Sequence, residues 1–71
     1  MKGKKTFTKS EANKIIHLLG LKVNSERNKQ KTIRDKIRRI GFYITDFDQT
    51  YSGFTKRDFN VLIKKNIIKI I

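Results

Sequence analysis

The clearest candidate for a functional site in this sequence is a row of basic side chains at helical spacing. Arg27, Lys31, Arg34 and Arg38 stand at positions i, i+4, i+7 and i+11, so at about 100° per residue they fall within about 60° of one another on a helix. With no acidic residue among the four, each charge repels the next unless an anion neutralises them. This row, called the basic ridge below, predicts a surface that binds a polyanion; a merely solvated helix face is the alternative.

Nucleic acid is the commonest polyanion that such a ridge can follow. Lysine and arginine neutralise phosphates, and arginine also reads guanine edges through two hydrogen bonds. The N-terminal lysines are expected to form a flexible arm, residues 1–6, that contacts phosphate or enters a minor groove. A tyrosine after the helix can contribute through its polar tip or its ring. The candidate nucleic-acid-binding residues are Arg27, Gln30, Lys31, Arg34, Arg38, Arg39, Lys2, Lys4, Lys5 and Tyr43.

Catalytic chemistry has few candidates in this chain. The absence of cysteine and the single histidine exclude the usual zinc-ligand spacings and a cysteine nucleophile. Asp46, Asp48 and Asp58 with Lys56 superficially suggest a magnesium site for phosphodiester cleavage. Asp58, however, is better explained as a helix-capping residue. We therefore expect a protein that is not an enzyme and that uses no cofactor or metal.

The composition favours a small domain with a polyanionic partner. The chain has 71 residues, and 18 lysines and arginines against 6 acidic residues give it a formal net charge of +12. Its hydrophobic fraction of 37% is sufficient for folding. No apolar run approaches the roughly 20 residues that span a bilayer, and the basic N-terminus lacks the apolar stretch of a signal peptide. We expect a cytoplasmic protein without a membrane partner.

Two similar segments, FTKSEANKII at residues 7–16 and FTKRDFNVLI at residues 54–63, predict two capped helices. In each, a threonine precedes the helix and an acidic residue follows three positions later, which is the pattern of a capping box. The first helix is predicted over residues 9–19 with Gly20 as a left-handed stop, and the second copy ends at Asn66. Duplication and convergent use of the same capping chemistry both explain the similarity.

Between these helices the sequence predicts a third helix and a strand. Asn24 or Ser25 can cap a helix that runs to Ile40, with Gly41 as its stop. Strands are expected at 42–47 and 67–71, with 21–23 as a third, and a loop at 48–53. The expected fold is therefore a single α+β domain, residues 7–71, in the order helix, helix, strand, helix, strand.

Residues 8–44 resemble a known family of DNA-binding domains. TKSEANKIIHLLGLK followed by KTIRDKIRRIGFYI is similar to the helix-turn-helix of excisionase-type and mercury-resistance-type regulators. The resemblance implies a winged-helix-like fold in which Lys31–Ile40 is the recognition helix and residues 41–44 begin a wing. The connection between Gly20 and Lys31 departs from the pattern, because it carries ten residues instead of a few.

The sequence leaves two functions open. The first is a small regulatory or accessory protein that binds nucleic acid through the basic helix; only the family resemblance favours duplex DNA over RNA. The second is a small inhibitor or adaptor, of the kind that phages and mobile elements carry, with a protein or ribonucleoprotein partner. A monomer is narrowly favoured over a homodimer, since chains of this charge repel each other.

Overall fold

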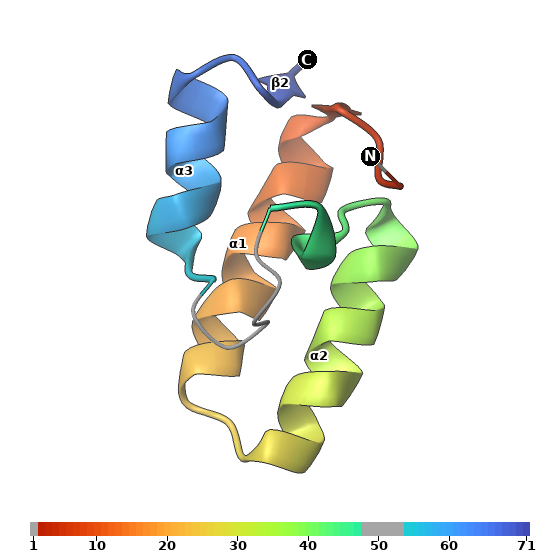
Figure 1. Ribbon diagram of the computed structural model, residues 1–71, viewed down its shortest axis with the longest axis vertical. Coiled ribbons are helices and arrows are strands. Elements are labelled where there is room, and N and C mark those ends of the chain that lie inside the picture. Colours follow the sequence, from red (N-terminus) through yellow and green to blue (C-terminus); the bar gives the residue numbers. More distant parts are fainter. Residues whose placement is uncertain (1, 48–53) are drawn as a thin grey trace.

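In the part of the chain that the structure describes, three α-helices, one 3₁₀ helix and a two-stranded parallel sheet confirm the predicted α+β class. The computed structural model describes residues 2–47 and 54–71. Helix α1 lies between α2 and α3, and the strands join the two ends of the chain at one end of the helices (Figure 1). In chain order the elements are β1 (Thr6–Phe7), α1 (Lys9–Val23), α2 (Arg27–Ile40), the 3₁₀ helix η1 (Ile44–Asp46), α3 (Lys56–Lys64) and β2 (Lys69–Ile70).

Helix α1 begins at the predicted capping box but does not end at Gly20. The Thr8 hydroxyl accepts a hydrogen bond from the Glu11 amide at 3.1 Å, and the Glu11 carboxylate accepts from the Thr8 amide at 2.9 Å. Gly20 remains helical, and the predicted strand at 21–23 is the last turn of α1 instead. The Lys22 side chain explains this extension, because it is buried and donates to the Phe54 carbonyl at 3.2 Å.

The predicted caps of α2 are wrong, whereas its predicted stop is confirmed. Ser25 donates its hydroxyl to the Leu21 carbonyl at 2.6 Å, and the Asn24 amide also donates to that carbonyl. Both residues therefore complete the end of α1, and Glu26 occupies the N-cap position of α2. At the other end Gly41 has a φ of 118°, a left-handed conformation that favours glycine.

The strand predicted at 42–47 is wrong, because this segment turns into η1. The Asp46 and Phe47 amides donate to the carbonyls of Tyr43 and Ile44, both at 3.0 Å. The turn brings the rings of Phe42 and Phe47 into a stack with centroids 5.6 Å apart. An extended strand would place these residues on opposite faces and separate them by about 16 Å. Burial of the two rings therefore favours the turn.

The short sheet pairs the two ends of the chain rather than the expected segments. Phe7 lies opposite Ile70 and Thr6 opposite Lys69 in a parallel register. The predicted strand at 67–71 is thus present only as β2, and its partner is the segment before α1 instead of 42–47. The left-handed exit predicted at Asn66 is confirmed, with φ at 59°. Asp58 also caps α3 as predicted, accepting from the Thr55 amide at 2.9 Å.

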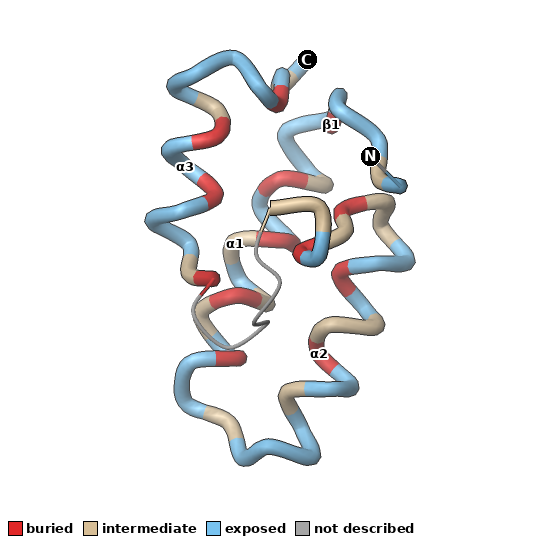
Figure 2. Tube along the Cα trace, in the orientation of Figure 1, coloured by how far each residue is buried: buried red, intermediate tan, exposed pale blue. Residues whose placement is uncertain are grey.

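Phe42 occupies the centre of the hydrophobic core. Its ring centroid lies 5.1 Å from that of Phe59, 5.6 Å from that of Phe54 and 6.1 Å from that of Phe7. All four phenylalanines are buried, and the buried positions of the helices face the inside of the molecule (Figure 2). The aromatic cluster joins β1, the segment after α2 and the start of α3, so it fixes the chain on both sides of η1.

Candidate nucleic-acid interface

Helix α2 carries the basic ridge on a face adjacent to its buried residues. Ile33 and Ile37 are buried in the core, and α2 packs against α1. The two helices run side by side in opposite directions (Figure 1). Antiparallel helices joined by a short connection form a helical hairpin. Residues 41–44, which the resemblance implied would begin a wing, lead into η1 instead of a strand.

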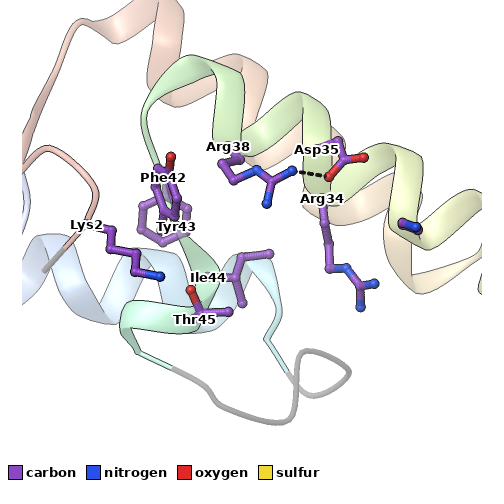
Figure 3. A pocket seen from close by; sticks show the side chains of 9 residues that line it. Lys2, Arg34, Asp35, Arg38, Phe42, Tyr43, Ile44 and Thr45 are labelled. Carbon is purple, nitrogen blue, oxygen red and sulfur yellow. Dashed lines mark hydrogen bonds and ion pairs between the residues drawn. The ribbon is translucent and has the colours of Figure 1, made fainter.

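Three residues of the basic ridge line a hollow between α2 and the η1 segment. The hollow has a volume of about 380 Å³. In Figure 3 the side chains of Arg34 and Arg38 extend from α2, and that of Lys2 enters from the N-terminal segment. The described residues that line the hollow are Lys2, Lys31, Arg34, Asp35, Arg38, Phe42, Tyr43, Ile44 and Thr45.

The N-terminal segment is hydrogen bonded to the domain at this hollow. Amides of Lys2 and Gly3 donate to the two carboxylate oxygens of Asp46, at 3.0 and 2.9 Å. The Lys4 amide donates to the Gly41 carbonyl at 2.9 Å. A Cβ on Gly3 would lie 2.8 Å from the Gly41 carbonyl oxygen, so the approach requires glycine. Residues 2–6, expected to form a flexible arm, thus lie against the domain, and Asp46 holds Lys2 beside the hollow.

The contact between Asp46 and the N-terminal segment should depend on pH. The Lys2 amide, followed by that of Gly3, holds the pKa of Asp46 below its ordinary value. A carboxyl group with a lowered folded-state pKa stabilises the fold above its unfolded pKa, and this contribution is lost as the pH falls through the folded value. We therefore expect the segment to loosen below about pH 4.

Amide chemical shifts of Lys2 and Gly3, recorded by NMR across a pH titration, measure this release. Asp46→Asn should show the released shifts at neutral pH and no titration of these two amides. Shifts that titrate equally in wild type and variant would show that another group controls the segment.

The basic ridge has an acidic neighbour that its spacing did not reveal. Asp35 pairs with Arg38, with 2.7 Å between carboxylate oxygen and guanidinium nitrogen. Asp35 lies three residues before Arg38, a spacing at which side chains of one helix meet. Both side chains are partly exposed, so the pair contributes little to stability. The hollow keeps an excess of positive charge, because Lys2, Lys31 and Arg34 line it as well.

Other predicted contact residues lie elsewhere or have structural contacts. Lys4 pairs with Glu11 at 2.8 Å and lies over the Phe7 ring, 5.2 Å from its centroid. The hydrogen bond from Lys4 is the main cause of the lowered pKa of Glu11. Gln30 donates its side-chain amide to the Ser25 carbonyl at 3.1 Å. The remaining three are exposed and do not line the hollow: Lys5, Arg27 and Arg39.

The structure thus brings together Lys2, Lys31, Arg34, Arg38 and Tyr43 from the predicted set. Sequence reasoning missed Asp35 as the partner of Arg38, although the i,i+3 spacing was readable. It also missed Thr45 at the hollow and Asp46 beneath the N-terminal segment. The sequence spacing does not indicate the role of Asp46, because the groups that donate to its carboxylate are backbone amides 43 and 44 residues away.

Two of the three acidic residues considered for a magnesium site have structural contacts. Asp46 holds the N-terminal segment and Asp58 caps α3, while Asp48 and the predicted loop at 48–53 lie outside the described residues. Within residues 2–47 and 54–71 no three histidine, cysteine, aspartate or glutamate side chains gather as metal ligands would. In the same ranges no helix has both the length and the apolar character needed to cross a membrane.

No family model, curated protein or solved structure matches the chain.

Proposed function

We propose that this chain binds duplex DNA through the basic ridge and the adjoining hollow. One observation carries the proposal: positive side chains from two distant segments, Lys2 and the α2 residues Lys31, Arg34 and Arg38, line the same hollow beside Tyr43. A solvated helix face would not need a lysine from the other end of the domain held there by hydrogen bonds. Convergence of this kind favours an anionic ligand.

The shape of α2 favours a duplex over a small anion. Its 14 residues form a rod about 21 Å long and about 10–12 Å wide with side chains. The ridge from Arg27 to Arg38 covers about 16 Å of it, enough to meet several phosphates in succession. The major groove of B-DNA is about 12 Å wide and admits an α-helix, whereas that of A-form RNA is too deep and narrow for side chains to read.

Tyr43 is suited to a supporting contact at the edge of the hollow. It is half-buried, so its ring is held in place before a ligand arrives. Its hydroxyl can donate to a phosphate oxygen. Thr45, which is exposed at the same hollow, offers a second hydroxyl of the same kind.

The proposal is tested by measuring the affinity of the protein for three nucleic acids with the same base sequence: duplex DNA, single-stranded DNA and duplex RNA. Each affinity is measured across a range of salt concentrations. We expect duplex DNA to bind most tightly. If Lys2, Lys31, Arg34 and Arg38 each neutralise one phosphate, the logarithm of the association constant should fall against the logarithm of salt with a slope of about −3.6.

Preferential binding of single strands or of duplex RNA would contradict the assignment of the ligand. Failure to bind any of the three would contradict nucleic-acid binding altogether and would favour an acidic protein surface as the partner.

A further inference from the structure

A second basic surface lies on α3, apart from the ridge and hollow. Lys56, Arg57 and Lys64 are exposed, and with Asn60 and Val61 they line a shallow depression of about 300 Å³. At about 100° per residue the three bases fall within about 100° of one another. This set of three, called the α3 surface below, is opposite the buried residues of the same helix.

Acidic side chains do not neutralise the α3 surface within the part of the chain that the structure describes. Asp58, the acidic residue of α3, accepts hydrogen bonds from the backbone amide and the hydroxyl of Thr55. Glu11 and Asp35 form their ion pairs with Lys4 and Arg38, outside α3. The three charges lie along about 12 Å of one exposed helix face, a spacing that suits contacts to successive phosphates of a polyanion.

The two basic surfaces belong to helices on different sides of the molecule. Helices α2 and α3 flank α1 (Figure 1), and the exposed turns of α3 face away from α2 (Figure 2). The domain measures 32 × 23 × 20 Å. Ligands held on its two sides are therefore separated by more than a Debye length of about 8 Å at physiological salt. Salt screens their repulsion at that distance, so occupation of one surface does not prevent occupation of the other.

We propose that the chain bridges two DNA duplexes, one on the ridge and hollow and a second on the α3 surface. This inference rests on the proposed function, since it adds a second duplex to the first. The α3 surface binds the phosphate backbone of the second duplex through its three positive charges. Because its three charges come from one helix, this contact is weaker than the first, and contacts to phosphates are independent of base sequence.

A capture experiment tests the bridge with the full chain. One duplex is fixed to beads, protein is added at saturation and unbound protein is washed away, and a second, fluorescent duplex is then offered. Wild type should retain the fluorescent duplex. A variant that combines Lys56→Gln, Arg57→Gln and Lys64→Gln should bind the bead duplex as wild type does. It should capture the second duplex roughly a hundredfold more weakly at 0.15 M salt, because three phosphate contacts are lost.

A control variant with the same loss of charge separates position from net charge: Lys14→Gln, Lys29→Gln and Lys36→Gln, three exposed lysines outside both surfaces. It should capture the second duplex like wild type. Undiminished capture by the α3 variant would overturn the bridge and would point to two chains joined through another surface. Wild-type protein that binds the beads but captures nothing would overturn the bridge alone, whereas no binding to the beads would overturn the proposed function.

Discussion

Replacing Lys31, Arg34 and Arg38 together by glutamine should weaken duplex DNA binding by roughly a hundredfold at 0.15 M salt. Each phosphate contact contributes about 0.9 to the salt slope, which at this concentration is about a fivefold gain in affinity per contact. The slope itself should become shallower by about 2.7. Glutamine keeps the length of the side chain and a good helix propensity, so the fold of α2 should be preserved.

The matched control for this prediction is the Lys14, Lys29 and Lys36 variant introduced above. Two of its lysines lie on α2 itself, about 160° or more around the helix from the centre of the basic ridge, and all three are exposed. Its affinity should fall only by the weak effect of lower net charge. If both variants lost affinity equally, binding would follow total charge, and the ridge would have no special part in it.

Phe42→Ala should have the largest effect on stability. Truncating a buried phenylalanine costs about 3–5 kcal/mol, and Phe42 is 1% exposed at the centre of the aromatic cluster. A domain of 71 residues has a total stability of about 4–11 kcal/mol. Urea denaturation should therefore show a midpoint at much lower urea, and a variant unfolded at 25 °C if the wild type lies at the lower end of this range.

Phe47→Ala is the control for Phe42→Ala. Phe47 stacks on Phe42 but remains partly exposed, so its truncation removes less buried surface and should leave the domain folded. A cost of less than about 1 kcal/mol for Phe42→Ala would mean that the cluster does not hold the chain on both sides of η1. The hollow would then lack the support that this structure assigns to it.

Helix ends were the part of the fold that the sequence predicted best. Thr8 with Glu11 and Thr55 with Asp58 determine a helix start within four residues, and Gly41 and Asn66 adopt the left-handed exits expected of them. Such signals are local, because the hydrogen bonds that they predict join near neighbours.

Strands were predicted poorly, because their partners are distant in sequence. Residues 42–47 have β-branched and aromatic side chains, yet ring packing around Phe42 favours a 3₁₀ turn. Strand propensity reports how well a side chain fits a half-buried sheet, and no sheet covers this segment. Gly20 failed as a stop for a similar reason: burial of Lys22 extends α1 past it.

Part of the candidate site was readable from periodicity alone. Lys31, Arg34 and Arg38 share one face because they share one helix, so their spacing was sufficient. Lys2 joins them through hydrogen bonds from its own amide and that of Gly3 to Asp46. Every residue except proline has a backbone N–H donor, so residue types do not reveal these hydrogen bonds. The position of Lys2 beside the α2 residues could therefore be found only from the structure.

Amide chemical shifts recorded by NMR show directly whether duplex DNA binds at the basic ridge and the hollow. Duplex DNA is added below one equivalent to isotope-labelled protein, so that the tighter surface fills first. We expect shift changes at Lys31, Arg34 and Arg38, at Lys2 and over residues 43–45, with Lys14 on α1 unchanged. Changes confined to α1 or α3, with the outer face of α2 and the hollow unaffected, would contradict it.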